Sequence, residues 1–167
     1  MQRGASVQNP EHKVIERLRI VENLVSRVGL HNPAASEICR HAAMHVGSDA
    51  CLMTLASTSK QHIIGAYGMR THIPHFDRRF DDEAMETSFF EVLDLPGHAD
   101  AATSPLVNGS VDAFRSMITT PLFYEGNVVG EMYFFFRSGH QPFTEYERRE
   151  VLAEKRKAQA FLTAAAE

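Results

Sequence analysis

The sequence predicts an α/β fold of the α+β type, in which an antiparallel β-sheet is covered on both faces. Three observations lead to this prediction. Two β-hairpins are indicated at 50–67 and 116–136, a helix is indicated at each end of the chain, and one strand is apolar on both sides. Antiparallel strands with one solvated face alternate apolar and polar residues, so a strand without this alternation indicates cover on both faces.

The first helix is predicted from Asn9-Pro10 to Val28, because an N-cap residue followed by proline favours a helix start and Gly29 favours its end. Its apolar positions are spaced four, three, four and three residues apart, as in a heptad seam. These positions are Val14, Leu18, Val21, Val25 and Val28. The seam either packs on the chain's own sheet or forms part of a homodimer interface.

A second helix is predicted from Asn32-Pro33 to Gly47, followed by strands at Ala50–Ser57 and Gln61–Tyr67. The region 68–115 has weak periodicity, and such a long irregular insertion is usually functional or disordered. Its phenylalanines argue against disorder. We therefore expect it to cover the second face of the sheet, with a helix at Asp82–Leu93 and a short strand near Leu106-Val107.

The hairpin at 116–136 is the most strongly indicated element. Between its strands, Tyr124-Glu125-Gly126-Asn127 supplies turn residues, of which Gly126 and Asn127 can take positive φ at low cost. On the second strand, Tyr133 and Phe135 point to one side, away from Met132, Phe134 and Phe136. A capping box at Thr144–Glu147 then begins the last helix, which is expected to reach Ala165 with a solvated charged stretch at Glu150–Lys157.

Length, charge and cysteine content bound the function. A chain of 167 residues fits a flexible arm at 1–8 and a single domain at 9–167. A net charge of −4 gives no electrostatic basis for binding nucleic acid or an anionic membrane, and no apolar run reaches the roughly 18 residues of a membrane span. Cys39 and Cys51 have neither zinc-site nor CxxC spacing. A reduced, cytoplasmic protein is expected.

Four motifs in order give the chain a resemblance to the GAF domain family. They are Gly47-Ser48-Asp49-Ala50 before the first strand, Ser116-Met117-Ile118-Thr119-Thr120-Pro121-Leu122, Gly126-Asn127-Val128-Val129-Gly130-Glu131-Met132, and Phe143-Thr144-Glu145-Tyr146-Glu147. The resemblance covers about Val14 to Leu162. It implies a GAF/PAS-like architecture with about six antiparallel strands, both terminal helices on one face, and a pocket on the other face. It also implies a dimeric sensory role, with ligand state coupled to an output domain.

The chain departs from the better-defined branches of this family. Free-methionine-sulfoxide reductases use cysteines in the loops around the pocket, whereas Cys39 is predicted within a helix and Cys51 within a strand. Neither cysteine has the neighbouring histidine of bilin-binding members, and the signature of cyclic-nucleotide-binding members is absent. The resemblance therefore leaves the ligand and any cofactor unknown.

Candidate pocket residues come from both the irregular region and the sheet. They are His72, His75, Phe76, Phe89, His98, Thr119, Glu131, Tyr133 and Phe135. The histidines, with Asp77 and Asp100 near them, suit zinc, iron, haem or an anionic ligand, or else are ordinary loop residues; no metal site is assigned. Glu131 faces water, a pocket or a cation. The pair His41 and His45 has metal-binding i, i+4 spacing, but a solvated helix face is favoured.

No positioned nucleophile and base are evident, so a non-enzymatic function is expected. We expect a cytoplasmic sensory domain that binds a small molecule and signals through its terminal helices in a homodimer, to an output domain or signalling partner. The alternative is a structural module whose pocket is filled by its own side chains, serving dimerisation or partner docking. An enzyme ranks third.

Overall fold

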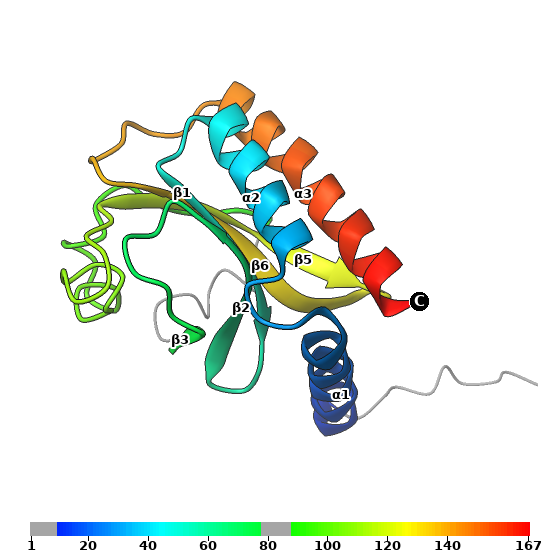
Figure 1. Cartoon of the computed structure of the whole chain (residues 1–167). Helices are drawn as coiled ribbons and strands as arrows, with labels where there is room; N and C mark the ends of the chain where they lie inside the picture. The colour runs from blue at the N-terminus through cyan, green and yellow to red at the C-terminus, as the bar shows by residue number, and fades with distance from the viewer. Residues whose placement is uncertain (1–9, 78–87) are drawn as a thin grey trace, which may run out of the picture.

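The computed structural model describes residues 10–77 and 88–167, which form one sheet with helices on one face and loops on the other (Figure 1). The elements are α1 (Pro10–Val28), α2 (Pro33–Val46), β1 (Ala50–Ala56), β2 (Lys60–Tyr67), β3 (His75–Asp77), β4 (Phe90–Val92), β5 (Ser116–Tyr124), β6 (Asn127–Phe136) and α3 (Glu145–Ala166). The predicted arm at 1–8 lies outside the described residues.

The sheet has the strand order β3-β2-β1-β6-β5-β4, and every neighbouring pair is antiparallel. The predicted six-stranded antiparallel sheet is therefore confirmed. The predicted turn between β5 and β6 is confirmed, and positive φ falls on Glu125 (49°) and Gly126 (77°). Tyr124 and Asn127 already pair across the strands, which leaves a two-residue loop whose central residues both need positive φ.

The helix face of the sheet is the face that α2 and α3 cover side by side, with α1 packed near the end of α3 (Figure 1). Of the three predicted cap motifs, those at Asn32 and Thr144 are confirmed, and Asn9 lies outside the described residues. The Asn32 side chain accepts hydrogen bonds from the backbone N–H groups of Ala34 and Ala35, and Thr144 and Glu147 cap each other reciprocally. The core of this face includes the buried residues Leu24, Cys39, Cys51, Met53, Ile118, Met132, Phe134, Val151 and Leu162.

The loop face is the opposite face, on which residues from β3, β4 and the 93–115 connection build a second core. This core contains Leu52, Phe76, Leu95, Leu106, Phe114, Met117, Tyr133 and Phe135. The expected cover on both faces of the sheet is thus present. Across residues 10–77 and 88–167, no helix combines the length and apolar character needed to cross a bilayer.

Two predictions for the irregular region were wrong. The end of the helix expected at Asp82–Leu93 is strand β4, in which Phe90 pairs with Thr119 and Val92 with Met117; residues 78–87 lie outside the described residues. The strand expected near Leu106-Val107 is a series of turns, because backbone groups bond locally, as in Val107 N–H to the Ser104 carbonyl at 2.9 Å. Pairing at the sheet edge set the conformation of β4, and local turns set the conformation near Leu106-Val107, because helical periodicity was weak in both segments.

Candidate ligand site on the loop face

Four polar side chains lie fully buried where β2, β1, β6 and β5 run side by side. They are Gln61, Thr54, Glu131 and Thr119. Thr54 pairs with Glu131 across the β1–β6 ladder, and Thr119 pairs with Tyr133 across the β5–β6 ladder. Strand alternation places Glu131 on the same side as Tyr133, which belongs to the loop-face core. This part of the sheet is therefore polar beneath its cover.

Thr54 organises half of this polar group. Its Oγ1 lies 2.5 Å from Gln61 Oε1, and it accepts a hydrogen bond of 3.2 Å from the backbone N–H of Glu131. These contacts join β2, β1 and β6 through side chains, and they satisfy buried polar groups that would otherwise be costly. Thr54 and Gln61 are therefore built into the fold of the site.

Thr119 and His98 differ from this pair. The Thr119 hydroxyl and His98 Nδ1 are buried, and neither has a hydrogen-bond partner among the residues that the structure describes. Both residues neighbour Phe90. This residue stands opposite Thr119 in the β4–β5 ladder, and its ring centroid is 6.3 Å from that of His98. A buried polar atom without a partner costs about 1–3 kcal/mol, so native proteins keep few of them. Both atoms are therefore candidates for bonding a ligand, and both belong to residues that neighbour Phe90.

The other end of the loop face is filled by aromatic rings. Phe114 stacks on Phe135 with centroids 4.4 Å apart, and Phe135 stacks on Tyr133 at 5.4 Å. Phe76 meets Tyr133 edge-on at 5.5 Å. All four rings are buried. The loop face is therefore divided into a packed aromatic end and a polar end.

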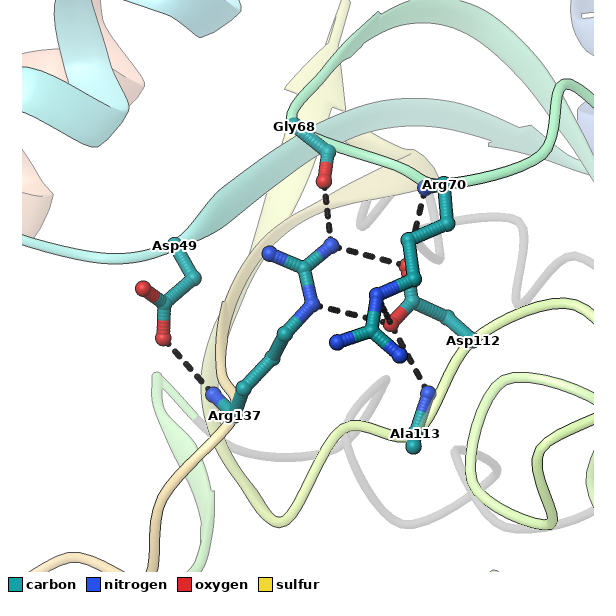
Figure 2. Close-up of polar contacts among 6 residues, drawn as sticks. All are labelled: Asp49, Gly68, Arg70, Asp112, Ala113 and Arg137. Atoms are coloured by element: carbon teal, nitrogen blue, oxygen red, sulfur yellow. Dashed lines mark hydrogen bonds and ion pairs between the residues drawn. The ribbon is translucent and has the colours of Figure 1, made fainter.

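An ion pair between Asp112 and Arg137 fixes the loop cover at the aromatic end (Figure 2). Asp112, only 2% exposed, accepts hydrogen bonds from Arg137 Nε at 3.0 Å and Nη2 at 2.9 Å. It also accepts bonds from the backbone N–H groups of Arg70 and Ala113. Burial opposes the charge, but these donors outweigh it and lower the pKa of the Asp112 carboxyl.

Arg137 extends this connection to the strands. Its Nη2 also donates to the Gly68 carbonyl, and its backbone N–H donates to Asp49 Oδ2 at 2.7 Å (Figure 2). Its guanidinium lies 5.2 Å from the centre of the Phe114 ring. The end of β6, the entry to β1 and the exit from β2 are thereby joined to the loop that carries Asp112. This charged cluster therefore attaches the loop cover to the strands.

The predicted site residues fall into separate groups. Thr119 and Glu131 lie at the polar end of the loop face, His98 lies beside Phe90, and Phe76, Tyr133 and Phe135 form part of the aromatic core. The remaining three lie elsewhere: His72 is exposed in the β2–β3 connection, His75 is half-buried in the edge strand β3, and Phe89 packs against the helix-face core. The structure thus separates His72 and His75 from His98.

The predicted seam on α1 is also divided. Val21 and Val28 are buried in the chain's own helix-face core, Leu18 and Val25 are half-buried, and Val14 is 51% exposed. Leu18, Val21 and Val25 line a cleft of about 310 Å³ beside Ser57 and His62. The exposed part of the predicted seam therefore lies in the first half of α1, next to this cleft.

A buried carboxylate in α3 was missed by the sequence reasoning. Glu154, expected in a solvated stretch, is fully buried, and its Oε1 contacts His45 Nδ1 at 2.7 Å and Lys157 Nζ at 3.0 Å. His45 Nε2 also lies 2.9 Å from Glu150 Oε2. His45 therefore joins α2 to α3, although its side chain is exposed, as the predicted solvated helix face requires. Within residues 10–77 and 88–167, no group of three or more potential ligand side chains has metal-site geometry.

Comparisons with known proteins identify the fold. No protein-family model matches the sequence, and no curated protein matches it. Solved structures do match. The GAF domain of a phosphoenolpyruvate-protein phosphotransferase from Coxiella burnetii has a TM-score of 0.66 and 13% identity, over 91% of this chain and 95% of that one. The GAF domain of the Acinetobacter phosphoenolpyruvate-protein phosphotransferase has a TM-score of 0.64 and 16% identity, over 90% and 93%.

An enzyme is similar to nearly the same degree. The free methionine-R-sulfoxide reductase from Neisseria meningitidis has a TM-score of 0.62 and 16% identity, over 93% of this chain and 89% of that one. The chain therefore has the GAF fold, as its sequence motifs predicted. Because structures with this fold include regulatory domains as well as a reductase, the fold alone leaves the choice between sensing and catalysis open.

Proposed function

We propose that this chain is a non-enzymatic sensory domain that binds a small molecule at the polar end of the loop face. The observation that carries the proposal is that two buried polar atoms, the Thr119 hydroxyl and His98 Nδ1, belong to residues that each neighbour Phe90 and have no partners in the described part of the chain. A ligand offering hydrogen-bonding groups to both would remove their desolvation cost. Tyr133 stands opposite Thr119 in the β5–β6 ladder, and Glu131 lies two residues away on the same side of β6, so both would supply further polar contacts.

Ligand occupancy would reach the helices through the sheet. Met132 and Phe134 alternate with Glu131 and Tyr133 along β6 and belong to the helix-face core. We propose that the domain is cytoplasmic and forms a homodimer through the first half of α1 and the cleft beside it, where Val14 and Ile15 are more than half exposed. An output domain or signalling partner would then read the position of the terminal helices.

The cysteines support a role without thiol chemistry. Cys39 and Cys51 are fully buried in the helix-face core, on the opposite side of the sheet from the proposed ligand site. Burial, reinforced by the neighbouring Cys39 thiol, raises the pKa of the Cys51 thiol. Thiolates are the reactive form, so such thiols are poor nucleophiles. We expect no reduction of free methionine-R-sulfoxide by the purified chain with dithiothreitol, and turnover above the buffer rate would contradict this part of the proposal.

The second candidate is a structural module without a ligand. The buried stack of Phe114, Phe135 and Tyr133 favours it, because these rings already fill the aromatic end of the loop face. In that case the polar end would be closed as well, and the domain would serve only dimerisation or docking. The two candidates differ in whether the Thr119 hydroxyl has a partner that is not part of the chain.

Native mass spectrometry of the untagged chain, compared with its denatured mass, tests both parts of the proposal. We expect a dimer that carries additional small-molecule mass. A strict monomer at high concentration would contradict the dimer interface, for which Val14→Glu is the matched variant. An empty dimer would favour the structural module.

A further inference from the structure

Two histidines far apart in sequence meet at the surface between two connections. His31 lies between α1 and α2, and His72 lies between β2 and β3. Their Nδ1 atoms are 3.4 Å apart, and their ring centroids are 5.0 Å apart with planes tilted by 49°. Neither residue takes part in the candidate ligand site. The contact between these two histidines is therefore separate from that site.

His31 is held rigidly. Its backbone has a φ of 47°, which is uncommon for a residue with a side chain, and its N–H donates to the Ile63 carbonyl at 3.0 Å. Its Nε2 lies 2.7 Å from the Ile73 carbonyl oxygen. A carbonyl only accepts hydrogen bonds, so Nε2 carries the proton and donates it, and Nδ1 of the neutral ring keeps its lone pair. That lone pair belongs to the nitrogen that approaches His72.

This arrangement matches one half of a zinc site. Zinc ligands at tetrahedral angles and Zn–N distances of about 2.0–2.1 Å place two nitrogens about 3.3–3.4 Å apart. Two cis ligands at a right angle, as in tetragonal copper sites, would lie only about 2.9 Å apart. A backbone carbonyl that accepts the other ring N–H of a ligating histidine is the usual orienting contact in metal sites. Ile73 provides that contact to His31.

We propose that His31 and His72 form a two-histidine zinc-binding site, in which water completes the coordination. The bound ion would connect the α1–α2 connection to the β2–β3 connection. A second pair of neighbouring histidines, His62 on β2 and His75 on β3, lacks this geometry. The rings of His62 and His75 lie edge to face with centroids 6.1 Å apart, and the Lys60 ammonium nitrogen stands 3.4 Å from His75 Nε2, where it would repel a cation.

Isothermal titration of the untagged full chain with zinc chloride at pH 7.5 tests the proposal. We expect one ion per chain, and we expect His72→Ala to weaken binding by roughly tenfold or more because one of two protein ligands is lost. His31→Asn should do the same, and asparagine tolerates the positive φ.

The matched control is His75→Ala, which removes a histidine from the neighbouring edge strand and should leave zinc affinity unchanged. His72 is exposed, so its replacement is not expected to disturb folding, and the test does not depend on the His31 variant. Zinc should also perturb the ring NMR signals of His31 and His72 before those of other histidines. Equal zinc affinity in the wild type and His72→Ala, or an equal loss in His75→Ala, would overturn the proposal.

Discussion

The two faces of the sheet are built from different chemistry. The helix face is largely aliphatic, and its buried carboxylate, Glu154, contacts His45 and Lys157. The loop face combines an aromatic stack with a polar end at which the Thr119 hydroxyl and His98 Nδ1 remain without partners among the described residues. Glu154 Oε2 also lacks a partner among the described residues, but Oε1 of the same carboxylate is bonded, whereas the Thr119 hydroxyl on the loop face has no hydrogen bond there and therefore reduces stability. Costs of this kind concentrate at functional sites.

A core truncation on the helix face should have the largest effect. Phe134→Ala removes a fully buried ring beneath the helices, and we expect it to lower the free energy of unfolding by about 3–5 kcal/mol. Phe123, which is 40% exposed in β5, is the matched control, and Phe123→Ala should cost about 1 kcal/mol or less. Urea denaturation checks both values. Similar costs for the two variants would contradict the packing of the helix face.

Breaking the charged cluster on the loop face should come next. Arg137→Ala leaves the buried Asp112 carboxylate without its ion-pair partner, and we expect a loss of about 2–3 kcal/mol. This is below the cost for a fully buried pair, because the guanidinium is 26% exposed. Arg70→Ala is the control: its side chain is 64% exposed and 4.0 Å from Asp112, so the change should be within about 0.5 kcal/mol. If Arg70→Ala lowered the free energy of unfolding as much as Arg137→Ala, Arg137 would not be the main ion-pair partner of Asp112.

The same cluster predicts how stability depends on pH. The pKa of Asp112 is lowered in the folded state, so its stabilising effect is present above the unfolded value of about 3.9 and is lost as the pH falls through the lower folded value. Asp112→Asn should therefore be less stable than the wild type at pH 7, with a difference that shrinks as the pH falls below about 4. Denaturation at several pH values measures this, and a pH-independent difference would contradict it.

Adjacent threonines provide the smallest and sharpest comparison. Thr120 Oγ1 donates to the Ser88 carbonyl at 2.9 Å, whereas the Thr119 hydroxyl has no partner within the described residues. Thr120→Val should destabilise the ligand-free protein by about 1 kcal/mol, and Thr119→Val should stabilise it by up to about 1 kcal/mol. Thermal denaturation of ligand-free samples distinguishes the two signs. A change in stability of the same sign for both variants would contradict the difference in hydrogen bonding between Thr119 and Thr120.

The sequence predicted the fold through local signals. Proline after a cap residue, the Thr144–Glu147 capping box and the turn at Gly126 each act within a few residues, so they can be recognised without the tertiary structure. The period of two along β6 likewise placed Glu131, Tyr133 and Phe135 on one side. Segments whose structure depends on distant neighbours were predicted wrongly, as at β4, where pairing with β5 decides the conformation.

The charged contacts could not be predicted for the same reason. Asp112 and Arg137 are 25 residues apart, and His45 and Glu154 are 109 residues apart, with no local pattern joining either pair. Glu154 stands among charged residues that resemble a solvated face, and only the packing of α2 against α3 shows it to be buried. Similarly, His72 was grouped with His75 by sequence proximity, whereas its partner in the fold is His31.

A thermal-shift screen of the wild type and Thr119→Val against a collection of small polar metabolites tests the central claim most directly. A ligand that binds only the folded state raises stability by about 2.7 kcal/mol at one hundred times its dissociation constant. We predict that at least one compound class raises the melting temperature of the wild type by several degrees and that of the variant much less. Equal shifts in both proteins would contradict a ligand site on the loop face. The site would also be contradicted if no compound shifted the wild type and Thr119→Val only raised the stability of the ligand-free protein.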